Sequence, residues 1–235
     1  MKRIYFMVFA LVAALLLASC AKDDPPPVVT TNDANPLSGL GSNTGYPTGK
    51  YFKLPSNIRV LGDIRGGLYG KAPVEKSYTG PFNVEEFKAN WVTLGTGTYV
   101  NLFIQFYNSA LNATTFTMPG GLIFIDSSDL YQHIPVYQKG YILQDVEVTV
   151  PALDTAFIQL RAYCLNAHLA PSSYDAVYYF GPITNNTQLN TITTIMNGKQ
   201  YPYGEEYNIQ QIVWNVTDNG LTLTSQEIAY LNGLP

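Results

Sequence analysis

Short stretches in which apolar and polar residues alternate constrain the fold of this chain more than any other feature. In residues 98–107, TYVNLFIQFY, every second residue is large and apolar, and the alternation returns in residues 146–150, VEVTV. A period of two places successive side chains on opposite faces of a β-strand, so each stretch predicts a strand with one face in a core. Further strands are expected in residues 116–125, with a break at the Pro-Gly-Gly sequence, and in residues 156–165. Residues 58–64 and 91–94 are weaker candidates.

The segments between these strands are too short for crossover helices, which predicts antiparallel pairing. We therefore expect a mainly β fold, an antiparallel immunoglobulin-like β-sandwich. After about residue 185 the apolar period becomes helical, as in residues 208–216, NIQQIVWNV. Residues 223–231, LTSQEIAYL, contain Thr224 and Glu227 at the spacing of a capping box. Short C-terminal helices, with a third over residues 189–196, should close the chain.

The N-terminal residues predict export. Lys2 and Arg3 precede an apolar run that ends in small residues before Cys20 and is too short to cross a bilayer comfortably. Residues 17–20, LASC, resemble the lipobox of bacterial lipoproteins, which implies a signal peptide over residues 1–19 and acylation of Cys20. In such lipoproteins an aspartate after the lipidated cysteine usually causes retention in the inner membrane, so Ala21 favours transport to an outer membrane. Residues 22–24, KDD, resemble the surface-export signal of lipoproteins in the Bacteroidota. The alternatives are a plain signal peptide with a chance cysteine and a simple solvated tether.

Composition divides the rest of the chain. Residues 20–50 are rich in Pro, Gly, Ser, Thr and Asn and predict a flexible linker behind the lipidated cysteine. Residues 51–235 are long enough for one domain with a sizeable core, the β-sandwich with its helical C-terminal part. The chain has 18 tyrosines, which suit a binding surface but are also good strand residues.

Cys164 is the only cysteine besides Cys20. An accessible thiol outside the cytoplasm oxidises or pairs with another chain, so Cys164 requires burial or chemical masking. It shares its strand parity with Ile158, Leu160 and Ala162, and free cysteine is among the most buried residue types. One interpretation is therefore a small core residue, and the other is a masked thiol.

Two motifs resemble those of bacterial thioester-domain adhesins: Tyr163-Cys164 and, downstream, residues 209–214, IQQIVW. In that family a cysteine sulfur and a glutamine side chain condense, with loss of ammonia, into an internal thioester, which implies a Cys164–Gln210 bond here. Residues 192–203, ITTIMNGKQYPY, resemble the segment that precedes the glutamine motif. On a helical wheel Gln210 borders the apolar arc and Gln211 points away from it. Trp214 shares the flank of Gln210 and is placed to shield a thioester from water.

Other chemistry is less well supported by the sequence. Cys164 and His168 lie near a strand end with no orienting acid identifiable, so we do not expect an enzyme. His133 and His168 lack metal-site spacing, and no metal or other cofactor is expected. Residues 126–129, DSSD, are not followed by the oxygen ligands of a calcium loop and are interpreted as a surface turn.

The sequence therefore predicts a lipid-anchored binding or adhesion module of the outer membrane, exposed on the cell surface. Its partners would be the membrane, through Cys20, and a protein or glycan of a host or neighbouring cell. Without the signal peptide, 17 acidic residues outnumber the basic ones by six, which makes nucleic acid a poor partner. The alternative is a non-covalent glycan- or protein-binding accessory lipoprotein with Cys164 in the core. Its candidate binding aromatics are Trp91, Tyr174 and Tyr178.

Overall fold

The computed structural model describes residues 37–67, 91–132 and 135–235. The expected signal peptide, the lipidation site Cys20, the export signal, His133 and most of the expected linker lie outside these ranges. The strands are β1 (Gly49–Tyr51), β2 (Ile58–Val60), β3 (Ile64–Gly67), β4 (Trp91–Gly95), β5 (Val100–Asn108), β6 (Thr114–Met118), β7 (Leu122–Asp126), β8 (Gly140–Tyr141), β9 (Val146–Val150), β10 (Thr155–Cys164) and β11 (Val177–Thr184). The helices are α3 (Ser127–Gln132), α4 (Thr187–Met196), α5 (Glu205–Thr217) and α6 (Ser225–Gly233).

Six of these strands close into an antiparallel barrel, so the expected immunoglobulin-like sandwich is wrong. The pairing runs β5-β3-β11-β7-β8-β10, and β10 pairs again with β5. Outer strands extend the barrel: β2 pairs with β5, β4 runs parallel to β10, and β1 pairs with β11. β6 and β9 form a separate two-stranded sheet.

The barrel closes through a strand that the sequence pattern could not reveal. β10 pairs with β5 from Thr155 to Ala162, and its last two residues, Tyr163 and Cys164, pair with β8. Since β8 has only two residues, Gly140 and Tyr141, it shows no alternation. The expected strands are present, but alternation reports which side chains face inward and not which strands pair across the fold.

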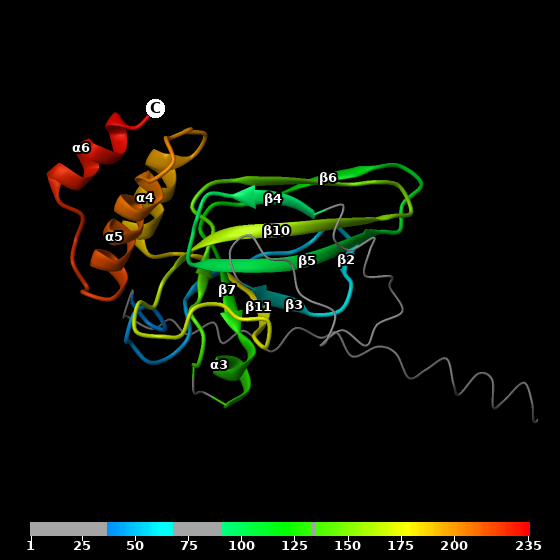
Figure 1. The fold of residues 1–235 in the computed structure, drawn as a ribbon, viewed down its shortest axis with the longest axis horizontal. Helices are drawn as coiled ribbons and strands as arrows, with labels where there is room; N and C mark the ends of the chain where they lie inside the picture. The colour runs from blue at the N-terminus through cyan, green and yellow to red at the C-terminus, as the bar shows by residue number, and fades with distance from the viewer. Residues whose placement is uncertain (1–36, 68–90, 133–134) are drawn as a thin grey trace, which may run out of the picture.

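Two apolar clusters lie on opposite sides of β10. Ile158, Leu160, Ala162 and Cys164 belong to the barrel core, as their shared parity predicts. Tyr163 belongs to a second cluster, which α4, α5 and α6 complete with the residues Leu189, Ile192, Ile209, Val213 and Leu231. Figure 1 shows these three helices gathered on one side of the strands. The end of β10 therefore lies between the barrel and the helical layer.

The three C-terminal helices confirm the helical period read from the sequence, and α6 has the expected capping box of Thr224 and Glu227.

Residues 37–48, which the sequence assigns to the linker, pack into the fold. Leu40 is buried in the helical cluster, and the N–H of Gly41 donates to the carbonyl oxygen of Leu165 at 2.9 Å. A Cβ on Gly41 would lie 2.0 Å from the backbone oxygen of Thr217, so this segment approaches the end of α5 closely.

Candidate functional site

β10 and α5 bring Cys164 and Gln210 together. The backbone N–H of Cys164 donates to Oε1 of Gln210 at 2.8 Å, and Nε2 of Gln210 donates to the backbone oxygen of Cys164 at 2.7 Å. The carboxamide therefore lies against the backbone of Cys164 much as a paired strand would. Both residues are 0% exposed. The structure thus unites the cysteine and the glutamine that the two sequence motifs single out.

The Cys164 thiol is held in a dry environment. Its Sγ accepts a hydrogen bond from the backbone N–H of Asn166 at 3.2 Å. Burial raises the pKa of the thiol to about 12, and the nearby Trp214 indole and the Asn166 N–H offset this only in part. Reactive cysteines of enzymes have lowered pKa values, because the thiolate is the nucleophile. The Cys164 thiol differs from these cysteines, because it is protonated at neutral pH.

The amphipathic pattern of α5 explains how Gln210 reaches the site. Ile209, Val213 and Val216 anchor the buried face of the helix, and Gln210 lies on that face while Gln211 is exposed, as the helical wheel predicts. Burying a carboxamide is costly unless it is hydrogen-bonded. The two bonds to the Cys164 backbone meet that requirement in place of water.

Trp214 lies beside the buried pair, and a second ring covers it. Trp214 packs against the barrel core that contains Cys164. The Tyr99 ring, from the segment between β4 and β5, lies 5.0 Å from the Trp214 ring at an interplanar angle of 57°. Tyr99 also meets Tyr207 edge-on, at 6.2 Å and 90°. Sequence analysis missed Tyr99, since it is one tyrosine among 18 and belongs to no motif.

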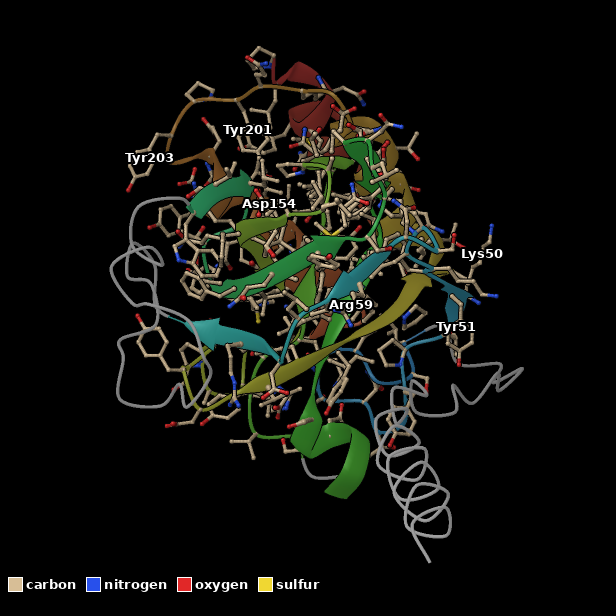
Figure 2. The ribbon with its side chains drawn as sticks, turned by 90° about the vertical axis from the view of Figure 1, so that its right-hand side faces the viewer. Lys50, Tyr51, Arg59, Asp154, Tyr201 and Tyr203 are labelled. Atoms are coloured by element: carbon tan, nitrogen blue, oxygen red, sulfur yellow. The ribbon has the colours of Figure 1, made fainter. Side chains whose placement is uncertain are left out.

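The neighbouring residue Tyr163 faces the helices. Its hydroxyl lies 2.6 Å from that of Tyr201, and burial raises the pKa of Tyr163 well above its ordinary value. Glu206 lies close to both hydroxyls, is 3% exposed, and accepts a hydrogen bond from the N–H of Gly204 at 2.7 Å. Tyr203, on the same loop as Tyr201, is exposed (Figure 2). The Tyr163-Cys164 pair thus ties β10 to the helices with one side chain and to the barrel with the other.

His168 has an acidic neighbour that the sequence did not reveal. Its Nδ1 lies 3.6 Å from Oδ1 of Asp218, which also accepts a hydrogen bond from the N–H of Ala167 at 2.9 Å. The His168 side chain is 47% exposed, whereas Cys164 is fully buried and its sulfur is bonded to the Asn166 N–H. The imidazole and the thiol therefore occupy different environments.

Residues 126–129 do not form the expected surface turn. Ser127 begins α3, and Asp126 and Asp129 are both buried. Asp129 Oδ2 lies 2.5 Å from Nζ of Lys139, and this lysine is also buried. Asp126 accepts hydrogen bonds from the Ser128 hydroxyl and from the N–H of Tyr137. The carboxylates serve an internal ion pair and local hydrogen bonds.

The aromatics proposed for non-covalent binding do not share one surface. Tyr178 is 1% exposed, lies in the barrel core, and donates from its hydroxyl to the Gln138 carbonyl oxygen at 3.1 Å. Trp91 and Tyr174 flank Phe103, with ring centroids 5.0 and 6.5 Å from it. Phe157 also packs edge-on against Trp91. Trp91 and Tyr174 thus belong to one partly buried ring cluster beside β5, apart from Tyr178.

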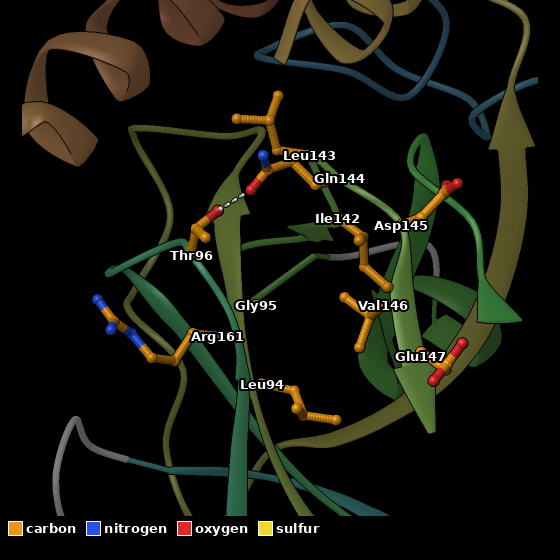
Figure 3. A pocket seen from close by; sticks show the side chains of 10 residues that line it. All are labelled: Leu94, Gly95, Thr96, Ile142, Leu143, Gln144, Asp145, Val146, Glu147 and Arg161. Atoms are coloured by element: carbon orange, nitrogen blue, oxygen red, sulfur yellow. Dashed lines mark hydrogen bonds between the residues drawn. The ribbon is translucent and has the colours of Figure 1, made fainter. Parts of the chain in front are cut away.

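A cavity of about 290 Å³ opens between β4 and the segment before β9 (Figure 3). It is lined by Leu94, Gly95, Thr96, Ile142, Leu143, Gln144, Asp145, Val146, Glu147 and Arg161. Nε2 of Gln144 bonds the carbonyl oxygen of Lys199 at 2.8 Å, and Asp145 accepts from the N–H of Gly120 at 2.8 Å. Gln144 and Asp145 thus link the strands around the cavity to neighbouring loops.

Among the described residues, no three His, Cys, Asp or Glu side chains are grouped as a metal site would require. The same residues include no helix with the length and hydropathy needed to cross a membrane. No protein-family model matches this chain, and no curated protein or solved structure is significantly similar to it.

Proposed function

We propose that this protein is a lipid-anchored adhesion module that attaches covalently to its target through an internal thioester between Cys164 and Gln210. One observation carries the proposal: the Gln210 carboxamide is hydrogen-bonded at both ends to the backbone of Cys164, in a site closed to water. The thioester resemblance of the two motifs agrees with that arrangement.

The hydrogen bonds support condensation of the two side chains. Attack of Sγ on Cδ of Gln210 places negative charge on Oε1, to which the Cys164 N–H already donates at 2.8 Å. Fixed backbone donors of this kind stabilise the oxyanion of a tetrahedral intermediate. The Cδ–Nε2 bond then breaks, and the nitrogen leaves as ammonia with the proton of the thiol. The S–C bond of the thioester takes its place.

A thioester stores an acyl group for one transfer. An amine or hydroxyl of the target attacks Cδ, the C–S bond breaks, and the thiol of Cys164 recovers a proton as the amide or ester forms. The full burial of both residues protects the bond from hydrolysis before that event. The product is a permanent attachment, so no turnover is expected.

We also propose that the domain is held at the outer membrane. Acyl chains on Cys20 would anchor it to the outer membrane, and two or more chains are needed for stable anchoring. The linker would hold it at the cell surface, within reach of a host or neighbouring-cell protein or glycan. Protease treatment of whole cells tests this location: a surface protein is cleaved, and full protection would place it inside the envelope.

Intact-mass measurement tests the bond. In the full chain with Cys20→Ser, Cys164 is the only thiol, and we expect a mass lower than the sequence mass by one ammonia. Methylamine should convert this species to one heavier than the sequence mass by a methylene group, with Cys164 open to alkylation after unfolding. Gln210→Ala should abolish the deficit, whereas Gln211→Ala, its exposed neighbour, should retain it. A full sequence mass with a thiol that reacts only on unfolding would make Cys164 a core residue of a non-covalent binder.

A further inference from the structure

The burial of Cys164 and Gln210 restricts access to the proposed thioester. Cys164 and Gln210 are both 0% exposed, so a nucleophile on another molecule reaches Cδ of Gln210 only if something moves. The group that moves must lie on the outer flank of Gln210 and must be free to turn without disrupting the barrel.

The turns of α5 locate that flank. Tyr207, Gln210 and Trp214 are spaced i, i+3 and i+7, so they follow one stripe of the helix with Gln210 between the two rings. Gln210 lies on the buried side of this stripe and Gln211 on the exposed side. The stripe is therefore the border between the site and solvent.

Tyr99 bridges this border. Its ring contacts both Trp214, at 5.0 Å, and Tyr207, at 6.2 Å. Tyr207 and Trp214 are about two helical turns apart, and Gln210 lies between them on α5, so the Tyr99 ring lies beside the stretch of helix that contains Gln210. Tyr99 itself is partly exposed, and so is Tyr207.

The backbone next to Tyr99 is fixed, which leaves the side chain as the mobile part. Gly97 donates from its N–H to the carbonyl oxygen of Arg161 at 3.2 Å and accepts from Nε of Arg161 at 2.8 Å. A Cβ on Gly97 would lie 2.0 Å from the backbone carbon of Ala162, so the segment lies tightly on β10. Tyr99 follows this anchor and immediately precedes β5. Rotation of a partly exposed side chain is fast, whereas displacement of such a segment is slow.

We propose that Tyr99 is the gate of the site: its ring closes the flank of Gln210 against Tyr207 and Trp214, and a nucleophile enters when the ring rotates outward. This inference rests on the proposed thioester for its biological meaning. The geometry of the gate is separate from the bond, because the ring would also control access to a free thiol.

Aminolysis rates test the gate. In the full chain with Cys20→Ser, Tyr99→Ala should still form the thioester and should react with methylamine about tenfold faster than the parent, since two ring contacts no longer hold the site closed. Tyr99→Phe keeps the ring and should react at the parental rate. Tyr107→Ala is a matched control, because Tyr107 lies near the other end of β5 with Arg59 over its ring. Rates for Tyr99→Ala within twofold of the parent would overturn the gate.

The gate and the thioester can be tested separately. If the parent has the full sequence mass, the thioester fails, and the rate of Cys164 alkylation by iodoacetamide in the folded protein becomes the measure. Faster alkylation of Tyr99→Ala than of Tyr107→Ala supports the gate without the thioester, and equal rates overturn it. If Tyr99→Ala does not fold, Tyr207→Ala removes one of the two contacts, and an unchanged rate in that variant overturns the gate.

Discussion

Two buried pairs of polar residues lie close together in the fold, and each satisfies its polar groups in a different way. One joins Lys139, just before β8, to Asp129 of α3, and the other joins Cys164 of β10 to Gln210 of α5. Lys139 and Asp129 are ionised groups held together at 2.5 Å, each nearly without solvent contact. Cys164 and Gln210 are neutral, and their polar atoms are satisfied by hydrogen bonds to backbone groups. The two pairs are linked through the backbone, because the N–H of Leu165 donates to the carbonyl oxygen of Lys139 at 3.1 Å.

The two pairs contribute to the stability of the fold for different reasons. A buried charge requires an opposite charge, so Lys139 and Asp129 account for one another. A buried cysteine requires no partner, since its thiol behaves as a small apolar group. The Gln210 carboxamide, however, satisfies the buried N–H and carbonyl groups of Cys164, which an apolar residue on α5 would leave without partners. Gln210 therefore stabilises the end of β10, whether or not it also forms the proposed thioester.

The largest effect should come from the charged pair. Lys139→Met leaves Asp129 buried without its cation, and removing one partner of a buried ion pair costs about 3–5 kcal/mol of unfolding free energy. Urea denaturation measures this loss. Adding Asp129→Leu to Lys139→Met should recover most of it, because well-packed apolar residues replace buried ion pairs with little penalty. A double variant as unstable as the single one would show that the pair does more than neutralise itself.

A smaller loss is expected at the neutral pair. Gln210→Ala leaves the N–H and carbonyl groups of Cys164 buried and unbonded, which costs about 1–3 kcal/mol. Gln211→Ala, on the exposed face of the same helix, should change stability by less than about 0.5 kcal/mol. Both are measured by urea denaturation in a Cys164→Ala background, in which no thioester forms, Gln210 keeps its primary carboxamide and the backbone groups of residue 164 are unchanged. If Gln210→Ala proved more costly than Lys139→Met, the ranking of the two pairs would be wrong.

The residues of this comparison also show what the sequence could and could not predict. The parity of β10 placed Cys164 in the core, and the period of α5 placed Gln210 on the buried border, because both follow from local repeats. The Lys139–Asp129 pair, the contact of Tyr99 with α5 and the closure through β8 join segments distant in the chain. Neither a two-residue strand nor a lone tyrosine leaves a periodic signal, so the closure of the barrel and the contact of Tyr99 with α5 became visible only in three dimensions.

The neutral site around Cys164 should also exclude charge. Burial raises the pKa of the Cys164 thiol from 9.0 to about 12. A group whose pKa is higher in the folded state contributes its stability fully below the unfolded pKa and loses it as the pH rises toward the folded pKa. Methylamine-treated protein, with a free thiol, should thus lose about 1.4 kcal/mol between pH 8 and 10 relative to Cys164→Ala.

Untreated protein provides the contrast, since a thioester has no proton to lose and should show no such difference from Cys164→Ala. The buried tyrosines titrate equally in both proteins and cancel. Equal pH dependence of treated protein and Cys164→Ala would mean that water reaches the thiol and that the site is not dry.

The smallest effect should come from a polar contact that water can replace. Thr224 and Glu227 form the capping box of α6 on the surface, where the Thr224 hydroxyl accepts from the N–H of Glu227 at 3.2 Å. Thr224→Ala should cost about 1 kcal/mol, the usual value of an N-cap, and Gln226→Ala in the first turn should cost almost nothing. Urea denaturation of both variants extends the series from a buried charged pair to a buried neutral pair to an exposed cap. The cost of desolvating unpaired polar groups sets that order. A larger loss for Thr224→Ala than for Gln210→Ala would therefore show that the backbone groups of Cys164 find other hydrogen-bond partners. The Gln210 carboxamide would then have no role in stability.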